Sequence, residues 1–409
     1  MCTARHEMAE LVKVPIVHFG ARRSSQYRYI HRDCVVELVS SNLAVLWSRL
    51  VTTIPVSYAG AVPHGDCKLQ IVIIGLLLVA VAPGVAAANP APSSKLYVAN
   101  SAGNDIHIID TVTNRVIHRV EVGPQPHGLV ATASGNSIFV TIENTKGEEG
   151  ELLWFDPIAD IVTRRMNVGP RPNQLACTPD GKLAYVPCDD ASWWVVDTIK
   201  GEVITKIATG GRPHNTLSSP DGKRMYLGPK GSYHVMIADT QSHRLLGEIP
   251  LSDAPRPIAI SRDEKRLYAN VDTLIGFEVA DVPSRKVIHR VEAEVPAELL
   301  RTASRSHGIG LTPDEKELWM CDVFHDRTYV FDLTIEPPRQ VASIKMRGGG
   351  YWICFSPDGK LCYISERIGN TVAVIDIATR TTIARIAVGE VPKRVLVVTP
   401  SGSAAVSSR

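Results

Sequence analysis

The stretch LYVANSAGNDIHIIDTVTNRVIHRVEVG, residues 96–123, contains three short apolar runs that alternate with clusters of Gly, Asn, Asp and Thr. Runs of this length, bounded by turn residues, are typical of β-strands. The middle run closes on an Asp, and an Asp recurs in this position at intervals of 46, 41, 42, 42, 51 and 44 residues. The seven copies are Asp110, Asp156, Asp197, Asp239, Asp281, Asp332 and Asp376. Because each precedes a turn, we interpret these carboxylates as acceptors of backbone hydrogen bonds.

A second landmark is a tight turn between two apolar runs. Pro presets the first central dihedral of such a turn, Asp bonds back to the backbone, and Gly accepts a positive φ. This turn also occurs seven times, at residues 134–136 (SGN), 179–181 (PDG), 220–222 (PDG), 262–264 (RDE), 313–315 (PDE), 357–359 (PDG) and 400–402 (PSG).

Together the two landmarks divide each period into four short strands. A period of about 40–45 residues with four strands predicts a β-propeller, so we predict an all-β fold with seven four-stranded blades over residues 95–402 and a tail at 403–409. The repeats begin at Lys95 with a second strand, and residues 391–399 (VPKRVLVVT) resemble the missing first strand. We therefore expect the C-terminal strand to pair with the N-terminal blade and close the ring.

One strongly apolar segment precedes the repeats. Lys68 is followed by LQIVIIGLLLVAVAPGVAAA (69–88), and its terminal alanines fit signal cleavage. We interpret 68–88 as a signal peptide followed by a linker at 89–94, which predicts a periplasmic or extracellular protein. The alternative is a membrane anchor, since twenty nearly uncharged residues can span a bilayer. Because a signal normally starts near the initiator Met, we interpret residues 1–67 as a mis-called or disordered leader.

Composition and cysteine usage limit the function classes. The chain has 44% hydrophobic residues, 21% charged residues and a formal net charge of +2, so nucleic acid is only a weakly favoured partner.

Five cysteines follow residue 88, an odd number in a chain too large to need disulfide bonds for stability. Only Cys354 and Cys362, which flank a turn, look able to form a bridge. The sequence contains no G-x-S-x-G, H-E-x-x-H or phosphate-loop motif, so catalysis has no positive support.

The pattern of LYVAN, then HIIDTVTNRVIHRVEVG, then a Pro-led strand and SPDGK resembles the YVTN-repeat β-propellers, which include the YncE-like secreted bacterial proteins. The resemblance runs from Lys95 to about residue 402, and is weakest at the turns 262–264 and 313–315 and the enlarged connection 292–308. It implies the fold and secretion. It does not fix the function, because propellers of this kind include binding modules, surface proteins, electron-transfer partners and occasional enzymes.

The loops between blades form the candidate site. In a four-stranded blade they share one face of the ring with the loops between the second and third strands. Six of the seven bring a cation, and three bring a His in alternate blades. Such a mouth would attract a carboxylate, a phosphate or an acidic partner segment, although basic surface loops are also common without function. The predicted ligand-binding residues are His127, Arg171, Arg212, His214, Arg256, Arg305, His307 and Arg394.

His127, His214 and His307 also suggest a copper or zinc site. Against this hypothesis, their blades are not neighbours, and the ligands of one metal must bring their nitrogens within about 2 Å of it. We therefore expect no cofactor as the first interpretation.

The leading hypothesis is a monomeric, secreted, non-enzymatic binding protein whose ligand is an anionic small molecule or a protein partner. The alternatives are a metal- or quinone-associated redox accessory, a lactonase-like enzyme, or a surface adhesion module.

Overall fold

The computed structural model describes residues 25–31, 34–40, 94–147 and 149–401. The chain divides into two compact units, Met1–Gly84 and Val85–Arg409. Within the predicted leader, β1 (Ser25–His31) and β2 (Cys34–Ser40) form an antiparallel hairpin. The predicted signal peptide (68–88), most of the linker (89–94) and the tail (403–409) lie outside the described residues. The described residues contain no helix with the length and apolar character needed to cross a membrane.

The second unit consists of seven four-stranded antiparallel sheets, here called blades 1 to 7. Blade 1 contains β30 (Pro392–Val398), β3 (Lys95–Asn100), β4 (Asp105–Asp110) and β5 (Arg115–Glu121). Blade 2 contains β6 (Pro126–Ala131), β7 (Ile138–Ile142), β8 (Gly150–Asp156) and β9 (Ile161–Val168). Blade 3 contains β10 (Ala176–Cys177), β11 (Leu183–Cys188), β12 (Ser192–Asp197) and β13 (Glu202–Ala208).

The remaining blades repeat this order. Blade 4 contains β14 (Arg212–Ser218), β15 (Arg224–Lys230), β16 (His234–Asp239) and β17 (Leu245–Pro250). Blade 5 contains β18 (Pro255–Ile260), β19 (Arg266–Val271), β20 (Gly276–Asp281) and β21 (Lys286–Glu292). Blade 6 contains β22 (Ser306–Leu311), β23 (Glu317–Asp322), β24 (Arg327–Asp332) and β25 (Arg339–Lys345). Blade 7 contains β26 (Gly350–Phe355), β27 (Leu361–Glu366), β28 (Thr371–Asp376) and β29 (Thr381–Ala387).

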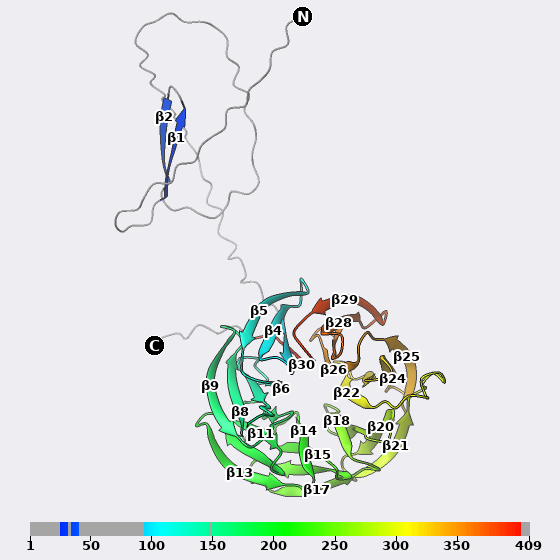
Figure 1. Ribbon diagram of the computed structural model, residues 1–409. Helices are drawn as coiled ribbons and strands as arrows, with labels where there is room; N and C mark the ends of the chain where they lie inside the picture. Colours follow the sequence, from blue (N-terminus) through cyan, green and yellow to red (C-terminus); the bar gives the residue numbers. More distant parts are fainter. Residues whose placement is uncertain (1–24, 32–33, 41–93, 148, 402–409) are drawn as a thin grey trace, which may run out of the picture. The chain divides into compact units, whose positions relative to one another are not determined.

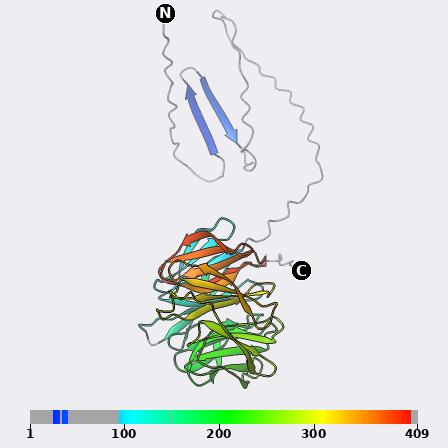
Figure 2. The same ribbon diagram turned by 90° about the vertical axis from the view of Figure 1, so that its right-hand side faces the viewer.

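The blades form a closed ring around a central channel, which Figure 1 shows along its axis and Figure 2 from the side. The first strand of each blade lies nearest the channel and the fourth lies at the rim. The ring closes where β30 pairs antiparallel with β3, from Lys95↔Val398 to Asn100↔Pro392. The predicted all-β propeller, its seven blades and its closure by the C-terminal strand are confirmed.

The apolar core lies between the blades. In the described chain the buried residues form seven clusters, and each cluster joins two neighbouring blades. Tyr97 and Ala99 of blade 1, for example, pack with Leu129 and Val140 of blade 2. Burial of this kind contributes about 25 cal/mol per Å² of apolar surface, and each blade shares its buried surface with both neighbours.

Local hydrogen bonds explain the two repeated landmarks. The Oδ1 atom of Asp110 accepts from the backbone N–H groups of Val112 (2.9 Å) and Thr113 (2.7 Å), and the other six strand-end Asp residues make the same kind of bond. In the Pro-Asp-Gly turns, Gly181, Gly222 and Gly359 have φ between 69° and 73°. The interpretation of these Asp residues as turn acceptors is confirmed.

The five cysteines of the propeller, Cys177, Cys188, Cys321, Cys354 and Cys362, are free. Cys354 pairs in register with Tyr363, and Cys362 pairs with Phe355. This offset of one residue places the two thiols on opposite faces of the sheet. The suggested Cys354–Cys362 bridge is therefore wrong for this geometry.

Candidate functional site

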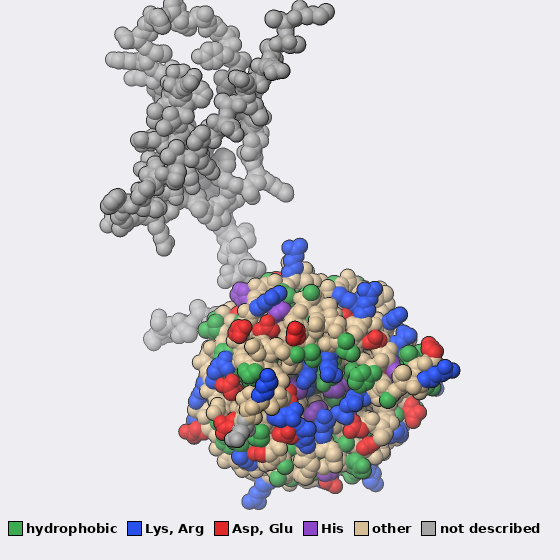
Figure 3. Space-filling model, in the orientation of Figure 1, with side chains coloured by type: hydrophobic (Ala, Val, Ile, Leu, Met, Phe, Trp, Pro, Cys, Tyr) green, Lys and Arg blue, Asp and Glu red, His purple; other side chains and the backbone are tan. Residues whose placement is uncertain are grey.

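The mouth of the channel is built by irregularities at the start of the inner strands. In β6, β14, β18, β22, β26 and β30 the pairing with the second strand shifts within the first few residues. A bulge of this kind leaves a residue out of the ladder and re-aims its side chain. The residues left out include His127, His214, Arg256, His307, Tyr351 and Lys393. The repeated bulge thus concentrates His and cationic side chains at one mouth, and Figure 3 shows Lys, Arg and His side chains around the centre of the ring.

Arg394 on β30 is the most deeply buried cation of this mouth, with 1% of its surface exposed. Its Nε donates to Oε1 of Gln174 (2.5 Å), and its guanidinium carbon lies 3.5 Å from the centroid of the Trp352 ring. Within the described chain its Nη1 and Nη2 atoms have no hydrogen-bond partner. Burial lowers the pKa of Arg394 to about 10, so the side chain stays charged at neutral pH.

The three predicted histidines surround Arg394 and are neutral. Burial, together with the charge of Lys230, holds the pKa of His214 well below its usual range. Burial and the charge of Arg394 do the same for His307. His307 stacks on Tyr351 with ring centroids 3.8 Å apart and bonds through Nδ1 to the Tyr351 carbonyl (3.0 Å). The histidines therefore add hydrogen-bonding groups to the mouth without adding charge.

His127 belongs to a buried ion cluster on the blade 2 side. Its Nδ1 lies 2.9 Å from Oε2 of Glu143, whose other oxygen accepts from Arg171 (3.1 Å), and Lys393 Nζ lies 3.8 Å away. Burial and the charge of Lys393 lower the pKa of His127 to about 3. Burial alone would raise the pKa of Glu143, but the His127 hydrogen bond and the nearby cations outweigh it and lower the pKa to about 2. A neutral His127 thus donates to an ionised Glu143.

We expect Glu143→Gln to destabilise the protein by about 2 kcal/mol at pH 7, because Arg171 and Lys393 lose their buried counter-charge. Since folding lowers the pKa of Glu143 from 4.5 to about 2, its contribution is complete above pH 4.5 and disappears as the pH falls toward 2. Urea denaturation of both proteins from pH 7 to pH 2 measures this difference. The exposed Glu202→Gln is the control, and a difference independent of pH would contradict the assignment.

A cavity of about 210 Å³ opens beside His214 and His307. It is lined by His214, Lys230, Arg256, Arg305, His307, Val323, Phe324, Tyr351 and Arg367. Four of these nine residues are cationic, and none of the described residues that line it is a carboxylate. This composition makes the cavity strongly electropositive.

The predicted cations divide into paired and unpaired side chains. Arg212 donates to Asp189 (2.8 Å), Arg171 reaches both Glu143 and Asp189, and Arg256 pairs with Asp272. In the described part of the chain, Arg305 and Arg394 have no carboxylate partner. The structure thus brings the eight predicted residues to one mouth, but three of the arginines are already neutralised.

Four residues of this mouth were not among the predicted site residues. Lys230 and Arg367 line the cavity, Glu143 holds His127 in place, and Trp352 covers Arg394. Lys230, Glu143 and Arg367 all lie at or just after the end of a second strand. Because loops after second strands share a face with the inter-blade loops, the same argument would have found them if it had been extended to those loops.

The comparison with protein families agrees with this architecture. The profile of the YNCE-like beta-propeller family matches residues 61–402, which is more than half of the chain. The protein belongs to this family. A search of curated proteins found no match.

Solved structures similar to this YNCE-like propeller include the periplasmic gluconolactonase of Pseudomonas aeruginosa, with a TM-score of 0.62, 19% identity and coverage of 75% of this chain and 99% of that chain. A second is hydrazine synthase of Kuenenia stuttgartiensis, with a TM-score of 0.58, 21% identity and coverage of 67% and 95%. A third is a functionally unknown protein from Desulfotomaculum acetoxidans DSM 771, with a TM-score of 0.64, 14% identity and coverage of 75% and 99%. At these identities the likeness shows the fold alone.

The histidines of this YNCE-like propeller do not form a metal site in this geometry. Among the residues that the structure describes, no three His, Cys, Asp or Glu side chains are grouped as a metal ion requires. The Nδ1 atoms of His127, His214 and His307 instead bond to Glu143, Asn215 and the Tyr351 carbonyl, respectively. Each ring nitrogen therefore has a different partner within the protein.

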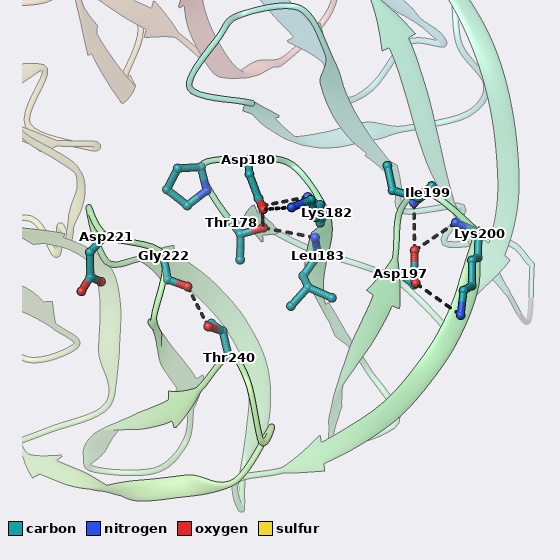
Figure 4. A pocket seen from close by; sticks show the side chains of 11 residues that line it. Thr178, Asp180, Lys182, Leu183, Asp197, Ile199, Lys200, Asp221, Gly222 and Thr240 are labelled. Carbon is teal, nitrogen blue, oxygen red and sulfur yellow. Dashed lines mark hydrogen bonds and ion pairs between the residues drawn. The ribbon is translucent and has the colours of Figure 1, made fainter.

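A larger cavity of about 580 Å³ lies at the opposite ends of the strands, between blades 3 and 4 (Figure 4). Its carboxylates are occupied by their own turns. Asp180 accepts from Thr178 and Lys182, and Asp197 accepts from the backbone of Ile199 and Lys200. The two lysines of the lining lie beside Asp180 and Asp197, so this cavity offers an anion no surplus of positive charge.

Proposed function

We propose that the protein binds an anionic ligand at the channel mouth and performs no chemistry on it. The single observation that carries this proposal is the guanidinium of Arg394, which is buried, charged and without a partner for Nη1 and Nη2 in the described chain. A buried charge with unsatisfied donors is costly. A ligand carboxylate or phosphate that reached these atoms would form a charge-assisted, bidentate pair and remove the cost.

The neighbouring cavity supports the same proposal. Lys230, Arg305 and Arg367 have no carboxylate partner among the described residues, and all three line the cavity. Converging cations in a low-dielectric cleft raise the local concentration of anions and speed their association. An anion is therefore attracted to this cavity.

A lactonase-like hydrolase is the second candidate, and one observation favours it. His127 donates through Nδ1 to Glu143, so Nε2 is the nitrogen with a free lone pair, as in a general base. A pKa of about 3 makes this nitrogen a weak base, however, because an efficient general base has a pKa near the working pH. The binding function therefore remains the stronger proposal.

We also propose that the protein is secreted and works as a monomer. The apolar segment 69–88 and the alanines at its end support removal of a signal peptide before the propeller. N-terminal sequencing of protein isolated from cell fractions tests this proposal. A mature terminus near residue 89 in the secreted fraction is expected, and an intact 69–88 segment in the membrane fraction would favour the anchor.

Calorimetric titration with succinate over a range of pH tests the binding function. Burial and the charges of Arg256 and Arg212 lower the pKa of Lys230 to about 8, and a bound anion would raise it again. Affinity is then constant below about pH 7 and falls above pH 8 by up to about tenfold per pH unit, because binding requires the protonated lysine. Succinate itself is fully ionised between pH 7 and pH 9.5, the range in which the decline is measured.

Two variants of Lys230 complete this test. Lys230→Arg keeps the charge at all pH values, so its affinity should stay constant above pH 8. Lys230→Met should bind more weakly at pH 7 and show no decline at higher pH. A wild-type affinity that does not change between pH 7 and pH 9.5 would show that Lys230 does not contact the anion.

A further inference from the structure

We propose that the ligand is a small molecule with two separate anionic groups, one held by Arg394 and the other by Lys230, Arg305 and Arg367. This inference rests on the proposed function and names the class of its ligand. A dicarboxylate and a phosphorylated carboxylate share this chemistry.

The first anionic position is the free edge of the Arg394 guanidinium. Trp352 covers one face of this group at 3.5 Å, and Gln174 accepts from Nε. The edge that carries Nη1 and Nη2 is left without a partner in the part of the chain that the structure describes. Two parallel N–H donors in a fixed plane match the two oxygens of one carboxylate or phosphate, so this buried edge has the donors that a single anionic group requires.

The second position is the cavity of about 210 Å³, which is lined by two histidines that lie near Arg394. His214 and His307 line this cavity, and the charge of Arg394 lowers the pKa of both. Asp272 neutralises Arg256, which leaves Lys230, Arg305 and Arg367 as the cations whose charge has no counterpart among the described carboxylates. A ligand with one negative charge would satisfy Arg394 or this group, but not both.

The walls of the cavity hold these cations in place before a ligand arrives. The guanidinium of Arg305 lies 5.5 Å from the ring centroid of Phe324, and that of Arg367 lies 5.5 Å from the ring centroid of Tyr351. Cation–π contacts of this kind restrain the side chains without consuming their charge or their N–H donors. The same aromatic rings give the cavity an apolar wall, which suits a short carbon chain.

The size of the cavity favours a small metabolite. Pockets for drug-sized ligands measure about 300–1,000 Å³, and this cavity measures about 210 Å³. It is too small for an acidic helix, whose diameter alone is about 10 Å. A small dianion fills it, whereas an acidic peptide or a nucleic acid would contact only its rim.

Matched pairs of ligands test the inference by calorimetry at constant ionic strength. Succinate is compared with succinamate, in which an amide replaces one carboxylate, and 3-phosphoglycerate is compared with glycerate. In at least one pair we expect the ligand with two anionic groups to bind at least tenfold more tightly than its partner with one. The pair that shows this ratio distinguishes a dicarboxylate from a phosphorylated ligand.

The double variant Arg305→Gln/Arg367→Gln should reduce this ratio to near one while monoanion binding persists. The exposed Arg339→Gln is the control and should leave the ratio unchanged. Equal affinities within both pairs, or binding only of a poly-glutamate peptide or an oligonucleotide, would overturn the inference and leave the proposed function standing. If wild type and Arg394→Met both fail to bind every anion, the proposed function is wrong as well.

Discussion

Arg394→Met is expected to weaken anion binding at least about 100-fold and to leave the free protein as stable as the wild type or more stable. Removing one partner of a buried charge pair costs about 2–5 kcal/mol of binding energy, and Arg394 is the only described cation of the mouth that is both 1% exposed and unpaired at Nη1 and Nη2. Calorimetric titration with succinate and urea denaturation of the free protein measure the two effects.

The expected stability of the free Arg394→Met protein follows from the lowered pKa of Arg394. Because burial lowers its pKa from 12.5 to about 10, carrying the charge at pH 7 costs the folded state about 3 kcal/mol. Losing the Trp352 contact and the Gln174 hydrogen bond offsets about 2 kcal/mol of the gain. A methionine keeps much of the packing on Trp352, so we expect a net change between zero and about 2 kcal/mol of added stability.

Two results would contradict this prediction. If Arg394→Met lost several kcal/mol of stability, Arg394 would be a structural residue, and its loss of binding would be a consequence of unfolding. If the variant bound succinate as the wild type does, the anion would bind elsewhere. Arg339→Gln, which removes an exposed arginine on β25, should change neither quantity.

The fold was predictable because its determinants are local and repeated. The turn at Asp110 depends on residues two and three positions away, so the sequence itself contains the interaction. Ring closure was predictable from position, since residues 391–399 supply the strand that the first blade lacks. The suggested Cys354–Cys362 bridge does not fit the structure because it depends on the strand register. A shift of one residue turns a side chain to the other face of the sheet.

The candidate site residues that occupy the same position in each repeat could be predicted from the sequence. The contacts between side chains of different blades could not. His127, His214 and His307 occupy equivalent positions and were found together. That Asp189 neutralises Arg212, or that Lys230 and Arg367 converge on one cavity, is a property of loops from different blades. Sequence spacing alone cannot show which cation meets a carboxylate and which meets the ligand, because such contacts join residues far apart in the chain.

Val395→Asp is expected to prevent stable folding, with a loss of more than about 4 kcal/mol. Val395 on β30 is buried between blades 7 and 1, where it packs with Leu96 and Val98 of β3 and with Tyr363 of β27. An unpaired carboxylate in this apolar cluster has no partner and opens the contact that closes the ring. Urea denaturation and near-ultraviolet circular dichroism measure the loss.

Ile383→Asp is the matched control for Val395→Asp. Ile383 lies on β29 in the same pair of blades but is 55% exposed, so the same substitution should cost less than about 1 kcal/mol. A Val395→Asp protein with the wild-type denaturation midpoint would show that the contact between blades 7 and 1 does not determine stability.

The closing strand also links folding to binding, because β30 carries Lys393 and Arg394 next to Val395. An anion that binds Arg394 selects the closed ring, and at 100 times its dissociation constant it stabilises the folded state by about 2.7 kcal/mol. Saturating succinate should therefore raise the denaturation midpoint of the wild type and partly restore the milder variant Val395→Ala, but should leave Arg394→Met unchanged. If succinate stabilises Arg394→Met as much as the wild type, the anion acts at another surface, and ring closure and ligand binding are independent.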